Sequence, residues 1–318
     1  MDGLRFVAAI AGSIASAALL TVTGPVELAR ADEAFAVEIA PGIYGHAGSI
    51  AMMDAANEGD IANLGFVVGE KGVAVIDTGG SVAVGKRLLA AIRSVTKKPI
   101  LFVINTHVHP DHIFGNAAFE GTGAQFVGHR NLPRALESHG AFYLKAFRNI
   151  IGDELMKDVR LVGPTLLVQD VSKVDLGGRE IELRAWPPAH TDCDLTVYDP
   201  ATRTLFAGDT VFLRHIPIID GSVKGWLANI GALADIPAVR VVPGHGPLVA
   251  PWPAALAEER GYFERLIGDV RAAIAKGDSL AQAADEAGQS EKDKWRLFGD
   301  YNARNATAAF AEYEWDQP

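Results

Sequence analysis

The chain has 318 residues, of which 49% are hydrophobic and 21% are charged, and its formal net charge is −10 at pH 7. A chain of this length and composition can bury a sizeable core in one large domain or two modest ones. The acidic balance argues against a nucleic-acid partner, because binding to phosphates requires a basic surface.

Residues 1–31 have the pattern of a secretory signal peptide. Arg5 precedes an uncharged apolar run at 6–20, and the small residues at 29 and 31 provide a cleavage site before Asp32. An uncleaved membrane anchor is the alternative, but the apolar run is shorter than the roughly 20 residues that a spanning helix needs. We predict cleavage after Ala31 and a periplasmic or secreted protein, and the oligomeric state stays open.

Residues 32–250 are expected to form one α/β domain. Residues 39–80 hold β-rich runs broken by glycine, and a helix is predicted over 81–96 with Ser81 as its N-cap. The apolar run at 99–107 then predicts a buried strand that leads into the sequence INTHVHPDHIFGN. This strand–helix–strand order places the histidines at the carboxyl end of a strand, where α/β folds carry their sites.

The next elements in the chain are also predicted to be strands and helices. A short strand at 124–129 and a helical stretch at 132–155 are predicted, then a strand at 179–190 that ends at His190. A hairpin at 194–210 reaches Asp209, and a strand at 239–246 reaches His245. Four strands are therefore expected to end at a histidine or an aspartate.

Residues 251–318 are expected to form a helical extension that packs on the same domain. Apolar residues recur at helical spacing in this region, and Gly277 and Gly288 are plausible helix stops. Residues 32–250 would then be the catalytic domain.

Three of the nine histidines and one aspartate fall within the six residues 107–112. His107 and His109 alternate, so on an extended segment they project the same way, and Asp111 and His112 follow after Pro110 turns the chain. Imidazole and carboxylate groups suit zinc, and imidazole also suits iron.

A zinc ion takes about four ligands, so the histidine motif needs further donors from elsewhere in the chain. The strand-end residues His190, Asp209 and His245 are the candidates. Together with the motif they make seven donors, which is the supply that a dinuclear site requires.

These motifs resemble the metallo-β-lactamase superfamily over roughly residues 37–250. The matching segments are H-x-H-x-D-H at 107–112, AHTDCDLTVY, LFAGDTVF and PGHG. The resemblance implies a four-layer αββα sandwich in the α/β class. It assigns one metal to His107, His109 and His190, the other to Asp111, His112 and His245, with Asp209 as the bridge.

Two further residues are interpreted through this resemblance. In this superfamily an aspartate at the place of Asp77 supports the ligand loop by hydrogen bonds. Some β-lactamases of the family place a cysteine where this chain has Asp209, whereas Cys193 lies elsewhere and is interpreted as a small buried residue. This departure weakens the prediction of antibiotic hydrolysis.

The finer resemblance is to the quinoprotein relay system zinc metallohydrolases. It rests on NEGDIANLGFVVGEKGVAVIDTGGS, HIPIIDGSVKGWL and RNATAAFAEYEW, so it reaches nearly the whole chain. It implies a periplasmic hydrolase associated with a quinoprotein dehydrogenase system and does not supply the substrate.

The expected function is that of a dinuclear-zinc hydrolase with a small-molecule substrate. Two zinc ions that share a water molecule lower its pKa to about 7, so a metal-bound hydroxide would attack an ester, lactone, thioester, lactam or phosphodiester centre. Asp111 would orient this hydroxide and take its proton. The alternatives are a mononuclear iron enzyme, a β-lactamase and a non-catalytic periplasmic metal-binding protein.

Two segments are expected to wall the substrate pocket. The loop before residue 61 carries Met52, Met53, Asn57, Glu58 and Asp60. The segment after Asp209 supplies apolar Phe212, Ile216, Ile218 and Trp226 and polar His215, Asp220 and Lys224. Of these, His215, Asp220 and Phe212 are predicted to contact the substrate, with His215 facing the metal cavity.

Overall fold

The computed structural model describes Met1 and residues 34–316, and the chain from Ala34 onward forms one compact unit. Apart from Met1, the predicted signal peptide lies outside the described residues. Within the part of the chain that the structure describes, every helix is too short or too polar to span a lipid bilayer.

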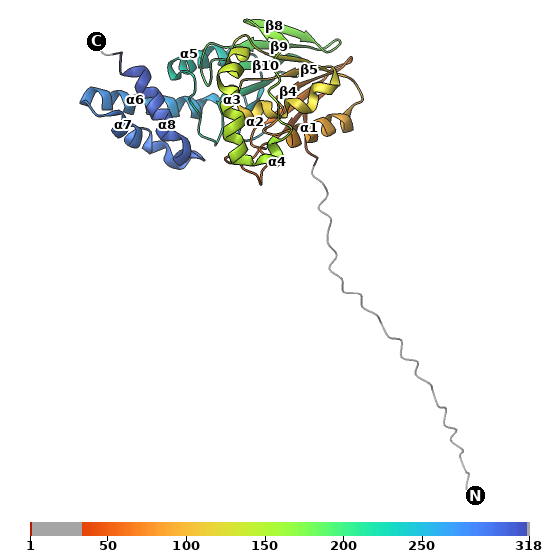
Figure 1. The fold of residues 1–318 in the computed structure, drawn as a ribbon, viewed down its shortest axis with the longest axis horizontal. Helices are drawn as coiled ribbons and strands as arrows, with labels where there is room; N and C mark the ends of the chain where they lie inside the picture. Colours follow the sequence, from red (N-terminus) through yellow and green to blue (C-terminus); the bar gives the residue numbers. More distant parts are fainter. Residues whose placement is uncertain (2–33, 317–318) are drawn as a thin grey trace. The chain divides into compact units, whose positions relative to one another are not determined.

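Two β-sheets form the centre of this unit (Figure 1). The first has seven strands in the spatial order β1 (Val37–Ala40), β2 (Ile43–His46), β3 (Leu64–Val68), β4 (Val73–Ile76), β5 (Ile100–Ile104), β6 (Gln125–His129) and β7 (Leu166–Val168). The second has six strands in the order β13 (Ala250–Pro251), β12 (Arg240–His245), β11 (Thr204–Phe212), β10 (Leu195–Asp199), β9 (Glu180–Ala185) and β8 (Val171–Asp175).

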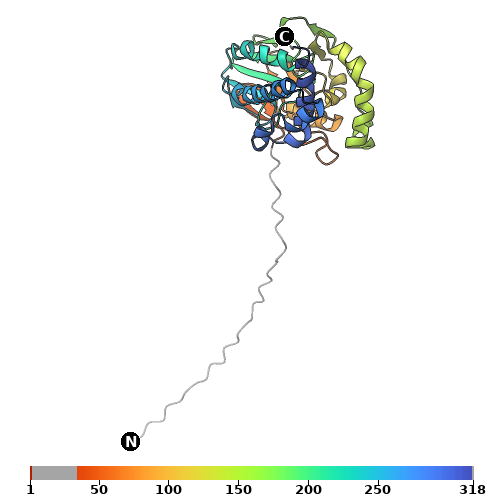
Figure 2. The ribbon, with the colours of Figure 1, turned by 90° about the vertical axis from the view of Figure 1, so that its left-hand side faces the viewer.

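The helices alternate with strands in the first half and follow one another at the C-terminus. They are α1 (Val82–Val95), α2 (Pro110–Ile113), α3 (Leu132–Ile151), α4 (Asp153–Met156), α5 (Val223–Ala234), α6 (Leu256–Lys276), α7 (Leu280–Glu286) and α8 (Phe298–Tyr313), with 3-10 segments η1 (Phe114–Thr122) and η2 (Gln289–Lys294). Figure 1 shows α6, α7 and α8 together in blue, and Figure 2 shows α3 in yellow-green along one side of the unit.

Three hydrophobic clusters order these elements into four layers. Apolar side chains of both sheets, such as Val67 and Val242, form the cluster between the sheets. On the outer face of the first sheet, α1 and η1 pack against β3, β4 and β5. On the outer face of the second, α5 to α8 pack against β11 and β12. The predicted αββα sandwich with a helical C-terminal region is confirmed.

The unit β4–α1–β5 positions the histidine motif as the sequence predicts. The Ser81 side chain accepts a hydrogen bond from the Val84 backbone N–H (3.3 Å) and caps α1. The strands β4 and β5 pair in parallel, so their carboxyl ends meet at one edge of the sheet. Residues 105–112 leave that edge and carry the motif.

Two predicted strand boundaries are wrong. Strand β9 ends at Ala185, five residues before His190, because Pro187 and Pro188 cannot donate ladder hydrogen bonds. Strand β11 continues past Asp209 to Phe212, since its residues are buried and keep pairing with β12. His190 therefore lies on a loop and Asp209 lies within a strand.

Two C-terminal helices end at or just before the glycines that were predicted to stop them. Helix α6 ends at Gly277, and Gly288 follows the end of α7. Both glycines have a left-handed backbone conformation. Helix α8 contacts the segment that follows β11. The Glu312 carboxylate accepts hydrogen bonds from the backbone N–H groups of Val223 (2.9 Å) and Lys224 (3.2 Å) at the start of α5.

Candidate metal centre

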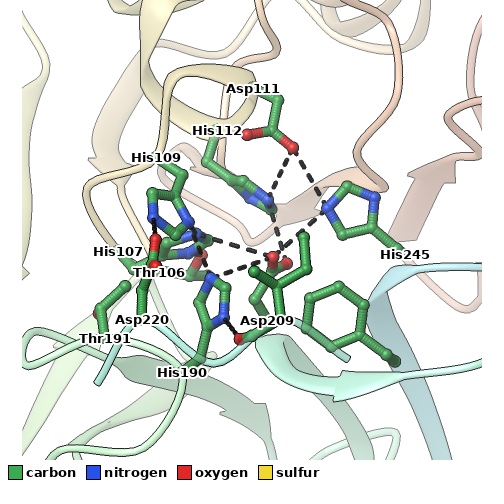
Figure 3. A network of polar contacts seen from close by, with 12 residues as sticks. Thr106, His107, His109, Asp111, His112, His190, Thr191, Asp209, Asp220 and His245 are labelled. Carbon is green, nitrogen blue, oxygen red and sulfur yellow. Dashed lines mark hydrogen bonds and ion pairs between the residues drawn. The ribbon is translucent and has the colours of Figure 1, made fainter. Parts of the chain in front are cut away.

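The seven predicted ligands lie together in two groups. One group contains His107, His109, His190 and Asp209, and the other contains Asp111, His112 and His245. Within each group the potential ligand atoms lie within 4.8 Å of one another (Figure 3). We call these seven side chains the metal cluster.

The cluster is assembled from the edges of both sheets. The first sheet supplies the loop after β5, with His107 and His109, and the first turn of α2, with Asp111 and His112. The second sheet supplies the other three, from the loop after β9, from β11 and from the end of β12. A Cβ at Gly244 would collide with the Asp209 carboxylate, which explains the glycine before His245.

Asp77 fixes two of the imidazoles from behind, as the family resemblance implies. Its Oδ2 accepts hydrogen bonds from His112 Nδ1 (2.8 Å) and from the Thr106 hydroxyl (2.7 Å). Because the Thr106 hydroxyl donates to Asp77, its oxygen accepts from His107 Nδ1 at 3.1 Å. Both histidines therefore use Nδ1 for these contacts and direct Nε2 to the cluster.

The other three imidazoles are fixed in the same manner. His190 Nδ1 donates to the Ile218 carbonyl (2.7 Å), and His245 Nδ1 donates to the Ile61 carbonyl (3.0 Å). His109 is turned round, because its Nε2 donates to Asp220 Oδ2 (2.9 Å) and leaves Nδ1 free. Carbonyl and carboxylate oxygens only accept, so each contact sets the tautomer of its ring.

The free nitrogens converge at distances that require a cation. His109 Nδ1 lies 2.8 Å from His190 Nε2 and 3.1 Å from His107 Nε2. His112 Nε2 and Asp209 Oδ1, 3.1 Å apart, are buried and have no hydrogen-bond partner. Lone pairs held this close repel one another unless a metal ion or a proton lies between them. The donors therefore fit divalent metal ions such as zinc or iron.

Asp209 lies between the two groups. Its Oδ2 is 3.3 Å from His190 Nε2 and 3.3 Å from His245 Nε2, while its Oδ1 faces His112 (Figure 3). This is the position that a bridging ligand needs. Asp111 lies on the second group's side, with Oδ2 3.2 Å from His245 Nε2.

Burial and mutual charge separate the pKa values of the cluster. Burial lowers the pKa of His190 to about 3, which keeps its imidazole neutral as a ligand must be. Burial also lowers the pKa of His245, but the carboxylates of Asp209 and Asp111 outweigh it and raise that pKa to about 9. Burial would raise the pKa of Asp209, but the surrounding histidines hold it well below its usual value.

A cavity of about 630 Å³ opens onto the cluster. It is lined by Met52, Met53, Ile61, Val108, His109, Pro110, Asp111, His139, Phe142, Tyr143, Phe147, Ile150, Pro188, Thr191, Asp192, Asp209, His215, Ile218, Asp220, Gly221, His245, Tyr301 and Arg304. Its volume is in the range of roughly 300–1,000 Å³ that small-molecule sites have.

His215 and Asp220, two of the predicted substrate residues, line this cavity. The His215 ring lies 5.0 Å from the His245 ring, and its Nδ1 donates to the Ile216 carbonyl (2.6 Å). Asp220 is engaged on both oxygens, by His109 on Oδ2 and by an ion pair with Arg304 on Oδ1. Asp220 therefore supports the His109 ring.

The predicted contact between Phe212 and the substrate is wrong in this structure. The Phe212 ring is fully buried and stacks on the His245 ring at 5.2 Å, so it lies beneath the ligands. The cause is the continuation of β11 to this residue, which turns the ring into the layer beneath α5 and α6. Trp226 and Ile216 are buried in the same cluster.

Sequence reasoning missed the contributions of α3 and α8 to the cavity. Tyr143, Phe147 and Ile150 come from α3, whereas Tyr301 and Arg304 come from α8 in the C-terminal extension. The one signal for α3 was the recurrence of large apolar residues at 143, 147 and 150 on a helix that already had a core-facing stripe. No local pattern in α8 points to the site.

Comparison with known proteins relates this architecture to one family. Residues 57–245, more than half of the chain, match the model of the metallo-beta-lactamase superfamily. The linear primary-alkylsulfatase of Pseudomonas sp. (strain ATCC 19151) is 27% identical over 57% of this chain and 40% of its own length. The 2,4-dinitroanisole O-demethylase subunit alpha of Nocardioides sp. (strain JS1661) is 26% identical over 69% of this chain and 60% of its own.

A third relative is the human acyl-coenzyme A thioesterase MBLAC2, 27% identical over 53% of this chain and 62% of its own length. The chain therefore spans only about half the length of these curated relatives.

Solved structures share the fold at low identity. The sec-alkylsulfatase Pisa1 from Pseudomonas sp. matches with a TM-score of 0.67 at 18% identity, over 88% of this chain and 50% of that one. A metallo-beta-lactamase from Pontibacter korlensis matches with a TM-score of 0.58 at 21% identity, over 72% and 98%. The sulfatase match thus extends over more of this chain than the lactamase match.

Proposed function

Because the chain belongs to the metallo-β-lactamase superfamily, we propose that it is a hydrolase whose seven converging side chains hold two zinc ions. The observation that carries the proposal is the orientation of the five imidazoles, each fixed by an acceptor on one nitrogen and free on the other. When bound, the ions would supply Lewis-acid activation of a water molecule and of the scissile bond at neutral pH.

Asp111 is the proposed proton acceptor. Its carboxylate lines the cavity and keeps one face open, whereas the other cluster carboxylate, Asp209, is surrounded by imidazoles. In the reaction, the oxygen of water forms a bond to the electrophilic centre of the substrate and Asp111 accepts the proton that the water loses. The bond to the leaving group then breaks, and the proton passes to that group.

An ester or thioester is the proposed substrate class. Two of the three relatives carry names that denote cleavage of a sulfate ester or an acyl thioester, which supports this class over a β-lactam. The metal-loaded mature protein should hydrolyse carboxylic-ester, thioester or sulfate-ester probes faster than β-lactam or phosphodiester probes. Faster turnover of a β-lactam would replace this proposal with antibiotic hydrolysis.

Elemental analysis tests the metal content. The purified protein should contain about two zinc ions per chain, because seven donors supply two sites of about four ligands with one shared. Stoichiometric iron with little zinc would favour the mononuclear iron enzyme instead. Full metal occupancy without turnover of any probe class would favour a metal-binding accessory protein.

We further propose that the protein is exported and acts beside a quinoprotein dehydrogenase system. The support is the tripartite N-terminus and the resemblance of three sequence segments to that group. Two of those segments are in contact in the structure, where Lys224 Nζ donates to the Glu312 carbonyl at 2.7 Å.

Export and the quinoprotein link have separate tests. Protein from the periplasm of the native host should have the intact mass of a chain that begins at Asp32, and retention of Met1 in the membrane fraction would contradict cleavage and favour a membrane anchor. Deletion of the gene should lower quinoprotein dehydrogenase activity in the periplasmic fraction. Wild-type protein should restore that activity, and a His107→Ala variant should not.

A further inference from the structure

Three large apolar side chains are exposed where the cavity opens beside the metal cluster. Phe142 is 67% exposed, Met52 46% and Ile150 45%, and all three line the cavity that also contains Asp111 and Asp209. A group of large apolar side chains left in water marks a binding surface, because covering it recovers free energy. The group shares one cavity with the metal cluster, so a substrate that reaches the cluster can cover it.

Aromatic rings on α3 lead outward from the cluster. The ring of Tyr143 lies 6.2 Å from that of His109, and the ring of Phe147 lies 6.3 Å from that of Tyr143. Ile150 continues the same face, because residues three and four apart on a helix are neighbours. From Tyr143 to Ile150 the helix rises roughly 10 Å, so this wall extends beyond any single scissile bond.

The loop between β2 and β3 also lines the cavity, through Met52 and Met53. Met53 belongs to the same hydrophobic cluster as Phe147. Asn57 holds the loop by donating its side-chain N–H to the Met52 carbonyl (2.8 Å). The end of the loop is tied to the metal cluster, since the Ile61 carbonyl accepts from His245 Nδ1. We call Met52, Met53, Phe142, Tyr143, Phe147 and Ile150 the apolar wall.

The charged side chains that line the cavity outside the metal cluster do not offer a free charge to a polar substituent. Asp220 is paired with Arg304, and Asp192 is paired with Arg134. The apolar wall itself contains no ionisable group other than the Tyr143 phenol, whose pKa burial raises to about 12. A charged or strongly hydrated substituent would therefore lose its solvation at the wall without a partner.

We propose that the substrate carries a linear apolar chain, which lies along Tyr143, Phe147 and Ile150 of α3 and contacts Met52 on the loop between β2 and β3. The position of its scissile bond at the metal cluster rests on the proposed function, whereas the chain site is defined by the wall alone. Methionine side chains suit such a chain because they adapt to its conformations.

A series of chain lengths tests the proposal by turnover. The zinc-loaded protein is assayed with p-nitrophenyl acetate, hexanoate and decanoate, and with n-hexyl and n-decyl acetate. The first series lengthens the acyl side and the second lengthens the alcohol side, so the two together identify which side occupies the wall. In the series whose lengthened side occupies the wall, each buried methylene should raise kcat/KM roughly three- to fourfold until the wall ends.

A double variant tests the wall itself. Met52→Ala combined with Ile150→Ala trims one exposed side chain from the loop and one from α3, so the fold should persist. The ratio of kcat/KM for the long ester to that for the acetate should fall roughly tenfold or more. The matched control is Leu280→Ala on α7, which removes a 41% exposed apolar side chain outside the cavity and should keep the wild-type ratio.

Calorimetric titration with decanoate and butyrate gives a readout that does not depend on turnover. Decanoate should bind the wild-type protein and the Leu280→Ala control with equal affinity, and bind the double variant more weakly, while butyrate binds none of them measurably. This arm decides the chain site even if no ester is hydrolysed, an outcome that would overturn the proposed function alone.

Two results would overturn the inference. One is a flat chain-length profile in a protein that hydrolyses the acetate. The other is equal decanoate binding by the wild-type protein and the double variant. A wild-type dimer that the double variant converts to a monomer, together with a flat profile, would assign the wall to self-association.

Discussion

The metal cluster and the apolar wall border one cavity but are built in opposite ways. Every imidazole in the cluster is held by a hydrogen bond at the nitrogen that faces away from the cluster, and four of its histidines are at most 2% exposed. The apolar wall is held by helix and loop packing, and three of its six side chains are exposed. The comparison teaches that reaction chemistry requires fixed atoms, whereas recognition of a flexible chain needs apolar area that can adapt.

The largest expected effect comes from removing a cluster ligand. His190→Ala should lose metal at one site and His245→Ala at the other, each with a loss of turnover of about a thousandfold or more, because a metal site that lacks a ligand loses its geometry. Elemental analysis and kinetics of the purified variants measure both effects. His139→Ala is the control, since it removes a cavity histidine outside both groups. Equal metal loss in all three variants would contradict the division of the cluster.

The next effect concerns proton transfer. Asp111→Asn should keep the fold and metal at the first site but lower kcat by about a hundredfold or more, as loss of a proton-transfer group does. Asp192→Asn is the matched control, because Asp192 lines the cavity outside the metal cluster and should retain turnover within about twofold. A near wild-type rate for Asp111→Asn on any hydrolysed substrate would remove Asp111 from the mechanism.

Support of a ligand should matter less than the ligand itself. Asp220→Ala removes the acceptor of the His109 Nε2 hydrogen bond and should weaken zinc binding roughly 10- to 100-fold, measured by competition with a chelator. Arg304→Ala removes the other partner of Asp220, whose ion pair is half exposed, and should change the affinity by less than about fivefold. Equal effects of the two variants would show that Asp220 acts through its charge pair.

The smallest expected effect comes from His215, which lines the cavity beside His245. His215→Ala should raise KM or change ester preference roughly two- to tenfold, the value of one hydrogen bond, and leave metal content unchanged. Leu280→Ala is again the control for an unrelated truncation. Loss of metal from His215→Ala would place this histidine in the cluster's support, through its 5.0 Å contact with the His245 ring.

The metal cluster was open to prediction because its signal is local and dense. Three histidines and one aspartate within 107–112 need a common partner, and the glycine-rich motifs around Asp209 and His245 supply the remaining context. The α1 cap at Ser81 and the helix ends at Gly277 and Gly288 were predictable for the same reason, since each depends on a few neighbouring residues.

The misplaced Phe212 shows where local reasoning stops. Phe212 follows Asp209 by three residues and was therefore expected beside the metals. The direction of its ring, however, depends on how far β11 continues beside β12. The role of Asp220 depends in the same way on the approach of the loop that carries His109. Pairing between segments far apart in the chain determines both.

The sequence by itself determined the α/β class through hydrophobic periodicity and the donors of the candidate metal site through the density of ligand residues, while the αββα layering came from the family resemblance. Only the tertiary structure decided which nitrogen of each imidazole is free, and that α3 and α8 complete the cavity. The physical reason is that hydrogen-bond acceptors such as the Ile61 and Ile218 carbonyls have no sequence signature. They become partners of His245 and His190 only when packing brings distant backbone to the cluster.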